Sequence, residues 1–312
     1  MRTALQILDC RLWAPGLAEA DGEAAARTLA ERFSEPEFGL ADPALTPTAA
    51  IGAAEAKAPA AGVPPMLRRR LSPLGRACAE TLWAIRDPET GRNPFLAPED
   101  AARTAVIFAS RWGDIEEAAR QVRDVAADRP LSPARFATSV HNGIAAVLTI
   151  AAGFHGNVLA IANGPFSLSA AFDSAVGLLT EVERVIVVAY DLKLPVEFDL
   201  PGSTHALAFL CARAEDDPNP LRMAALLARG PVVAQRSRAL RPGEAPDPRF
   251  AEPGAPSDDL ATLAWLMTPG AGARIRTVFG RHAALVWAKD SALECVNGWR
   301  LRAKPDAERS AS

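Results

Sequence analysis

Apolar residues in the middle of the chain fall into short continuous runs separated by longer amphipathic segments. Short runs rich in β-branched residues predict buried strands, whereas apolar positions at helical spacing predict helices. The expected strands are 105–109, 158–162 and 185–189, and the expected helices are 115–127, 142–152 and 168–179. Apolar strands that alternate with helices predict an α/β fold with its sheet covered on both faces.

Further signals extend this pattern in both directions. Leu-Ser-Pro occurs at 71–73 and at 131–133, which predicts two helices with Ser at the N-cap and Pro at the first helical position. The run Ala206–Cys211 predicts a strand antiparallel to 185–189, because parallel neighbours need a longer crossover. Near the C-terminus we expect a helix at 260–267 and extended segments at 283–287 and 295–301.

Segments poor in large apolar side chains predict the boundaries of the folded domain. The Ala/Pro-rich residues 36–65 predict a surface loop insertion, because they bury too little area to offset their ordering entropy. Clustered prolines predict a second loop at 241–258, and 304–312 is expected to be a disordered tail. The expected domain therefore comprises 1–35, 66–240 and, as a C-terminal helix and strands, 259–303.

Composition and charge argue against several classes of partner and site. Lys and Arg number 34 against 37 Asp and Glu, a formal net charge of -3, which argues against nucleic acid as a partner. The four cysteines and four histidines lack ligand spacing, so we expect no metal site, no cofactor and a reduced, cytoplasmic protein. Gly153 and Gly156 divide the uncharged stretch 143–162, which predicts a buried helix, a turn and a buried strand rather than an integral membrane segment.

The turn after strand 158–162 is the strongest candidate for a chemical site. A strand, a sharp turn and a helix form the architecture that exposes a nucleophile at a helix N-terminus. Ser167 follows the turn without a basic partner in sequence, and we interpret it as a helix cap, with a catalytic serine as the alternative. The turn itself contains no nucleophile; its residues are Asn163, Gly164, Pro165 and Phe166.

Three other residues carry charge or hydrogen-bonding capacity without a motif around them. His141, beside Asn142, can donate to a ligand, but we favour a buried histidine bonded to the backbone. His205 is isolated in sequence, and Asp191 resembles an ordinary charge at a strand end.

One basic cluster precedes the first Leu-Ser-Pro helix. It consists of Arg68, Arg69 and Arg70. We favour a solvated structural role with ion pairs, and the alternative is a binding patch for an acidic partner protein.

Five separated blocks of the chain carry a resemblance to a known family. They are RLWAPGL at 11–17, RRRLSPLGR at 68–76, VIFASRWGDI at 106–115, LSPARFATSVHN at 131–142 and VIVVAYDLKLP at 185–195. Together they cover most of residues 1–212 and omit the Ala/Pro-rich segment. They resemble the β-ketoacyl-synthase-like family, and most closely the chain-length-factor-like proteins of aryl polyene pathways.

The resemblance implies a thiolase-like α/β fold with one well-formed βαβ half, a mixed sheet and an abbreviated second half. The acyl-accepting cysteine of active members falls on Pro165, and the later histidine motifs have no match after Asp191. Proline supplies neither a nucleophilic side chain nor a backbone N–H. The resemblance therefore implies a silent chain-length factor that pairs with an active β-ketoacyl-ACP synthase and engages acyl carrier protein indirectly.

Site roles follow from the matched blocks. Residues 163–167 become candidates for the elbow and acyl tunnel, and the arginines at 68–70 for a carrier or partner patch. Ser139, His141 and Asn142 become interface candidates. Two alternatives stay open: an acyltransferase or condensing enzyme that uses Ser167 with His141, and a monomeric acyl-binding or scaffold protein.

Overall fold

A mixed sheet forms the centre of the computed structural model, which describes residues 4–14, 58–194, 198, 204–214, 232–251, 257–267, 275–281 and 283–289. The described strands form one sheet of eight, in the order β3-β2-β4-β5-β1-β6-β8-β7. Their bounds are β1 Ala4–Trp13, β2 Thr104–Ala109, β3 Asn157–Ile161, β4 Arg184–Asp191, β5 His205–Arg213, β6 Val232–Ala239, β7 Ile275–Phe279 and β8 Ala283–Lys289.

Strand direction agrees with the sequence pattern. Strand β2 pairs in parallel with β3 and β4, whereas β5 runs antiparallel to β4, as its short connection predicts. The predicted segment at 295–301 lies outside the described residues. Strands β6, β8 and β7 extend the sheet beyond β1 through antiparallel pairs.

Helices begin where the Leu-Ser-Pro signals predict. The Oγ of Ser72 accepts a 3.1 Å hydrogen bond from the amide of Gly75, whereas Ser132 occupies the N-cap of its helix without a side-chain bond. The described helices are α2 Pro65–Arg68, α3 Pro73–Ala84, the 3₁₀ helix η2 Pro98–Arg103, α4 Ile115–Ala126, α5 Pro133–Ser139, α6 Gly143–Ala152, α7 Ser167–Leu178, α9 Pro248–Ala251 and α10 Asp259–Met267.

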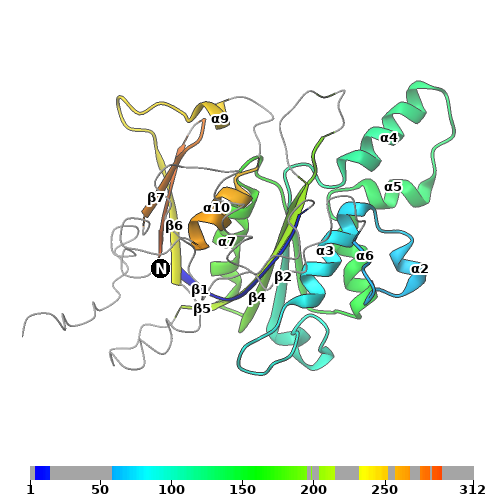
Figure 1. Ribbon diagram of the computed structural model, residues 1–312, viewed down its shortest axis with the longest axis horizontal. Coiled ribbons are helices and arrows are strands. Elements are labelled where there is room, and N and C mark those ends of the chain that lie inside the picture. Colours follow the sequence, from blue (N-terminus) through cyan, green and yellow to red (C-terminus); the bar gives the residue numbers. More distant parts are fainter. Residues whose placement is uncertain are drawn as a thin grey trace, which may run out of the picture.

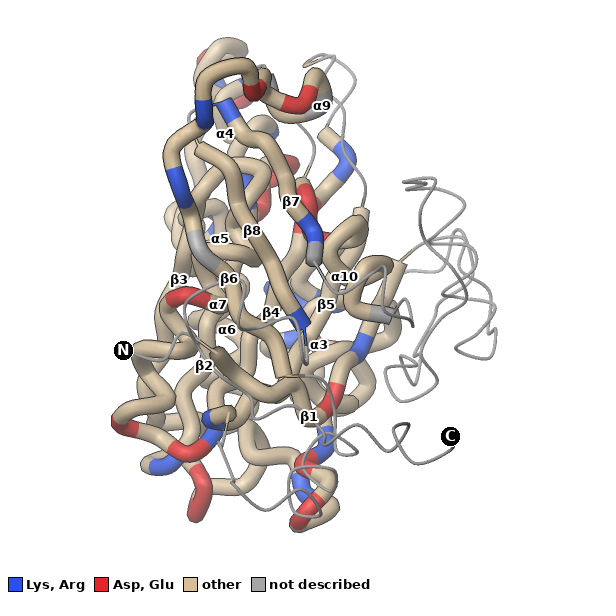
Figure 2. Tube along the Cα trace, turned by 90° about the vertical axis from the view of Figure 1, so that its left-hand side faces the viewer, with Lys and Arg blue, Asp and Glu red and all other residues tan. Residues whose placement is uncertain are grey.

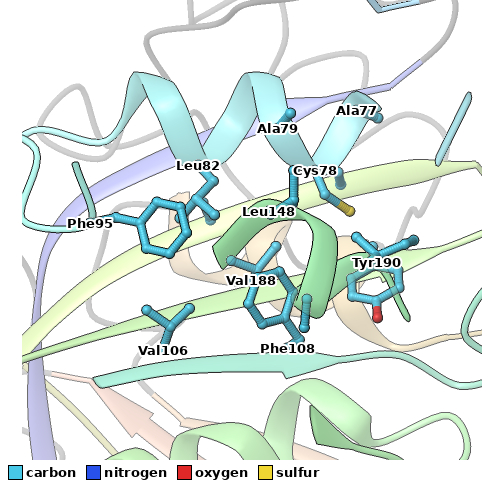
Figure 3. Packing of buried hydrophobic residues seen from close by; sticks show 14 of the residues in the cluster. Ala77, Cys78, Ala79, Leu82, Phe95, Val106, Phe108, Leu148, Val188 and Tyr190 are labelled. Atoms are coloured by element: carbon cyan, nitrogen blue, oxygen red, sulfur yellow. The ribbon is translucent and has the colours of Figure 1, made fainter. Parts of the chain in front are cut away.

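Helices cover both faces of the sheet, and successive strand residues point to opposite faces (Figure 1). Val106 and Phe108 of β2 pack under α3 and α6 in the cluster that Figure 3 shows. Ile107 of β2 and Val187 of β4 pack against α7 and α10 on the other face. Two apolar layers therefore enclose the central strands, which explains their uninterrupted apolar sequences.

Two structural findings correct the predicted surface loops. In the described end of 36–65, Ala58, Ala60 and Val63 are buried in the cluster that contains residues of α3, and the Trp83 side chain of α3 lies close against Gly62. Within 241–258, the short helix α9 forms and Phe250 is buried. The domain boundaries drawn from composition remain predictions.

The uncharged stretch 143–162 forms helix α6, a turn with Gly153 at a φ of 63°, and strand β3. The expectation of a buried strand is wrong, because β3 lies at the sheet edge and Val158 is 37% exposed. An apolar run does not distinguish an edge strand from a central one. Among the described helices, none has the length and apolar character needed to cross a membrane.

Candidate functional site

The turn that joins β3 to α7 is a tight, ordered elbow. Gly164 adopts a φ of 53°, a conformation that disfavours residues with a Cβ. The amide of Phe166 donates a 3.1 Å hydrogen bond to the carbonyl of Asn163, and a bridge links Asn163 with Pro165. Pro165 therefore stands at the tip, where the resemblance places the acyl-accepting cysteine.

Ser167 holds this elbow through its hydroxyl group. Its Oγ donates to the carbonyl of Gly164 at 2.8 Å and accepts from the amide of Asn163 at 3.0 Å. The residue is only 2% exposed, and no hydrogen bond joins it to His141. The prediction that Ser167 caps the helix is wrong, because Phe166 occupies the N-cap of α7 and the Ser167 hydroxyl bonds to the elbow instead. Its contacts are those of a structural residue in the first turn of α7.

His141 is held by the backbone, in agreement with the favoured interpretation. Its Nε2 lies 2.9 Å from the carbonyl oxygen of Ser110, and its own carbonyl accepts a bond from the hydroxyl of Tyr190. Ser139 likewise donates to the carbonyl of Phe136, whereas Asn142 is exposed. The interface candidates thus share one junction, between α5 and α6, and Asn142 presents its side chain to solvent.

Phe166 packs against the C-terminal part of the chain. Its ring lies 5.1 Å from that of Phe250, and a Cβ on Gly280 would approach it within 2.7 Å. Helix α9 and the hairpin of β7 and β8 therefore confine this side chain. A role for Phe166 in an acyl tunnel remains a prediction.

The N-terminus of α10 fastens the elbow from the same side. The amide of Asp258 donates a 2.9 Å hydrogen bond to the carbonyl of Pro165. The Asp258 carboxylate accepts two bonds from Arg276 of β7, at 2.7 and 2.8 Å, and both side chains are almost fully buried. Sequence reasoning missed this pair, although a Ser-Asp-Asp triplet before an apolar run is a helix-start signal.

Beside this contact lies a buried charge cluster, which consists of Arg111, Asp191, His205 and Asp259. Arg111 lies 3.0 Å from Asp191, and His205 Nε2 lies 3.2 Å from Asp259. Asp191 also faces His205 directly across the β4–β5 pair. Burial raises the pKa of Asp191 to about 6, although the Arg111 cation opposes the shift. Asp191 is therefore not an ordinary strand-end charge, and His205 is not isolated in the fold.

The basic cluster Arg68–Arg70 lies at the end of α2 and makes no ion pair with residues that the structure describes. Arg69 and Arg70 are exposed, and Met66 on the same short helix is 81% exposed. The favoured structural interpretation, with intramolecular ion pairs, finds no support within the described chain. Figure 2 shows basic and acidic positions interspersed elsewhere.

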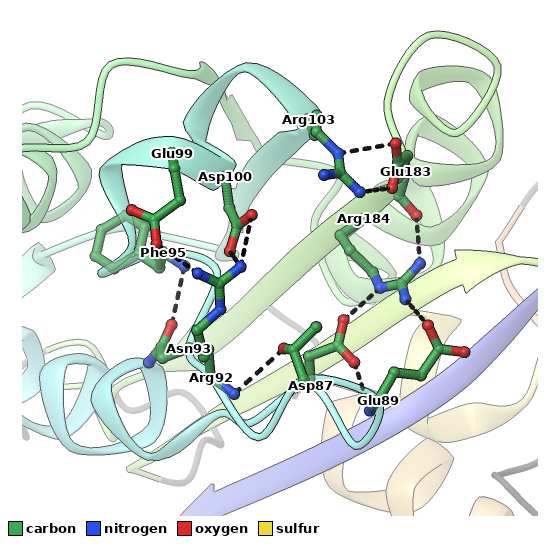
Figure 4. A network of polar contacts seen from close by, with 11 residues as sticks. Asp87, Glu89, Arg92, Asn93, Phe95, Glu99, Asp100, Arg103, Glu183 and Arg184 are labelled. Carbon is green, nitrogen blue, oxygen red and sulfur yellow. Dashed lines mark hydrogen bonds and ion pairs between the residues drawn. The ribbon is translucent and has the colours of Figure 1, made fainter.

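A second polar region lies at the opposite, amino edge of β2 and β4 (Figure 4). A cavity of about 180 Å³ is lined there by three arginines that already pair with carboxylates. These pairs are Arg92 with Glu99 and Asp100, Arg103 with Glu183, and Arg184 with Asp87 and Glu89. Alternating paired charges make this region a structural network. No group of three metal-ligating side chains occurs in the described chain.

Large apolar side chains are exposed on β3, an edge strand, and on the three helices that precede it. Helix α6 contributes Ile150, 65% exposed, and β3 contributes Val158. The preceding α4–α5 hairpin projects from the domain (Figure 1) and exposes Val122, Val125 and Phe136. Clustered exposure of this kind marks interaction surfaces.

The mixed sheet, its two helical layers and the strand–elbow–helix unit define a thiolase-like ketosynthase fold, as the sequence predicts. Residues 44–237 match the family described as "Beta-ketoacyl synthase, N-terminal domain". The chain belongs to this family, which confirms the resemblance. The match begins inside the Ala/Pro-rich segment that the sequence blocks omit.

Solved structures share this fold. The complex of the ketosynthase ApeO with its chain length factor ApeC from Xenorhabdus doucetiae aligns with a TM-score of 0.59 and 20% identity, over 91% of this chain and 99% of the other. The ishigamide ketosynthase/chain length factor aligns with a TM-score of 0.51 and 14% identity, over 72% and 82%. No curated protein sequence matches the chain.

Proposed function

We propose that this chain is a catalytically silent chain-length factor that pairs with an active β-ketoacyl-ACP synthase in an aryl polyene type pathway of fatty-acid or polyketide biosynthesis. Pro165 at the elbow tip carries the proposal. It lacks a nucleophile and an N–H, and its carbonyl is engaged by Asp258. The hydroxyl of Ser167, two residues further on, both donates and accepts a hydrogen bond with backbone groups of the elbow.

The exposed apolar side chains around β3 support a partner surface. An edge strand presents unpaired backbone groups, and Ile150 and Val158 add apolar area beside them. Two of the structural neighbours are described as ketosynthases with chain length factors. We therefore propose a heterodimer in which β3, α6 and the α5–α6 junction with Ser139, His141 and Asn142 face the synthase.

The proposed mechanism is geometric. Side chains that cross the interface close the acyl tunnel at a fixed depth, so excluded volume sets the chain length. Phe136, 60% exposed on α5, is large enough to act in this way. The elbow residues 163–167 are the candidates for the wall of the acyl tunnel in this proposal.

A second surface suits the carrier protein. Arg69 and Arg70 are exposed beside Met66, which combines positive charge with an apolar tip. Acyl carrier protein, if acidic, would complement this patch while delivering its cargo to the synthase. Three buried free thiols, Cys10, Cys78 and Cys211, are consistent with the reducing cytoplasm that we propose as the compartment.

Co-expression with the cognate synthase tests the proposal. We expect co-elution in size-exclusion chromatography, loss of co-elution for Val158→Asp, and longer products for Phe136→Ala. Thr180→Asp, at an exposed site beyond α7, is the matched control and keeps the complex. If wild-type chains never co-elute and products do not change, the proposal fails.

Mass spectrometry after incubation with an acyl-carrier-protein thioester tests silence directly. We expect no stable acylation. Acylation at Ser167 would establish the acyltransferase alternative, and a monomer that retains a buried acyl ligand would establish the scaffold alternative.

A further inference from the structure

The buried charge cluster joins four separate elements at the carboxyl edge of the sheet. Arg111 follows β2, Asp191 ends β4, His205 begins β5, and Asp259 begins α10. The three residues at the strand ends point to the sheet face that α7 and α10 cover, because they continue the alternation of residues such as Ile107, Val187 and Leu207. Asp259 reaches them from the first residue of α10. The cluster therefore connects the N-terminal part of the sheet with a helix from the C-terminal part.

The carboxylates of the cluster outnumber its guanidinium. Among these four residues, Asp191 and Asp259 face the single guanidinium of Arg111, and all of them are nearly inaccessible to water. Burying an uncompensated charge is costly. Protonation of Asp191, the carboxyl of the cluster whose pKa burial raises, leaves one carboxylate for one guanidinium and makes these charges neutral.

The backbone connects this cluster to the elbow. Asp259 contacts His205, and the adjacent Asp258 donates its amide to the carbonyl of Pro165. Asp258 is itself neutralised by Arg276 from β7, so the second carboxylate at the start of α10 already has a cation. The N-terminus of α10 therefore connects the charge cluster to the elbow through two adjacent residues.

We propose that the buried charge cluster is a proton-operated latch that fastens the N-terminus of α10, and with it the Pro165 elbow, to the sheet. The latch tightens when the cluster takes up a proton and becomes neutral. It loosens when the proton leaves and the excess negative charge remains buried. This inference concerns the isolated chain and does not depend on the proposed partner.

The direction of the pH effect follows from linkage. Burial raises the pKa of Asp191 to about 6, above its ordinary value of 3.8, so the protonated form is favoured in the closed state. Closure is therefore most stable at low pH and weakens as pH rises through the pKa of the closed state. One linked proton with this pKa changes the closing equilibrium by about tenfold between pH 5 and pH 8.

Hydrogen–deuterium exchange of the purified chain, corrected for intrinsic rates, tests the latch. Peptides that contain 162–168 and 258–263 should lose protection together, by about tenfold, as pH rises from 5 to 8. A peptide from α3 should not change. Uniform loss across the protein, or no loss in the two peptides, would overturn the proposal.

Two variants distinguish a pH effect that arises in the cluster from a pH effect on the whole protein. Asp191→Asn removes the excess negative charge and should make protection of both peptides independent of pH. Glu181→Gln, an exposed neutralisation, should behave like wild type. A pH dependence that survives in Asp191→Asn would contradict the latch, and if that variant does not fold, the wild-type profile alone decides.

Discussion

The backbone amide of Asp258 donates a 2.9 Å hydrogen bond to the carbonyl oxygen of Pro165. This bond joins the N-terminal family domain, which ends at residue 237, to the segment that follows it. The abbreviated C-terminal part is thus a structural support for the elbow. The bond also occupies the backbone oxygen of the residue at the tip of the elbow.

Removing the cation that holds Asp258 should destabilise the protein. In Arg276→Ala, the Asp258 carboxylate stays buried without its partner, and breaking such a pair costs about 3–5 kcal/mol. Urea denaturation measures the loss. Arg281→Ala, at an exposed position after β7, is the control and should change stability by less than about 0.5 kcal/mol. Equal effects of the two substitutions would contradict this account.

Ser167 should contribute to stability rather than to chemistry. Ser167→Ala loses the contacts with Gly164 and Asn163 and should cost about 1 kcal/mol. Ser174→Ala is the matched control, because Ser174 only bonds back to its own helix and alanine has the higher helix propensity. Thermal unfolding distinguishes them; a Ser167→Ala protein as stable as wild type would refute the role of this hydroxyl in holding the elbow.

Local pattern was sufficient for the elements that form the two cores. The alternation around β2 and β4, the cap at Ser72 and the strand–turn–helix unit at 157–178 all follow from periodicity and capping chemistry. These features depend on neighbours within a few residues. The short connection also identified β5 as antiparallel.

Contacts between distant segments could not be predicted in the same way. Arg111 and Asp191 meet because β2 and β4 are adjacent strands, and sequence spacing does not encode that adjacency. The edge position of β3 is equally hidden, since an apolar run fits both a central strand and an interaction edge. Ala58 and Ala60 are buried because their side chains are small enough to fit there. The composition of this segment predicted a surface loop, because it counts small side chains as contributing little buried area.

The ion pairs at the amino edge of the sheet should differ in strength (Figure 4). Arg184 has 19% side-chain exposure and contacts the buried Asp87, whereas Arg103 and Glu183 are exposed to 60% and 55%. We expect Arg184→Ala to lose roughly 2 kcal/mol and Arg103→Ala to change stability little. Urea denaturation with and without 1 M salt compares them, and a larger loss for Arg103→Ala would contradict this ranking.

The buried cysteines should resist alkylation. Burial raises the pKa of the thiols of Cys10 and Cys78 well above the ordinary value, so little thiolate forms even at pH 9. Iodoacetamide followed by peptide mass spectrometry should label Cys10, Cys78 and Cys211 only after denaturation. Rapid labelling of any of the three in the folded protein would show that its surroundings open.

Restoring a thiol at the elbow should not restore condensation. Pro165→Cys places a thiol at the elbow tip, but the contacts described for His141 and His205 are with Ser110 and Asp259 and not with the elbow. We therefore expect the thiol at most to accept an acyl group, because no described histidine is positioned beside it by a hydrogen bond. We expect no condensation product from acyl and malonyl carrier proteins, with Pro165→Ser as the control. Product formation above the wild-type background would show that the elbow lacks only a cysteine for condensing activity.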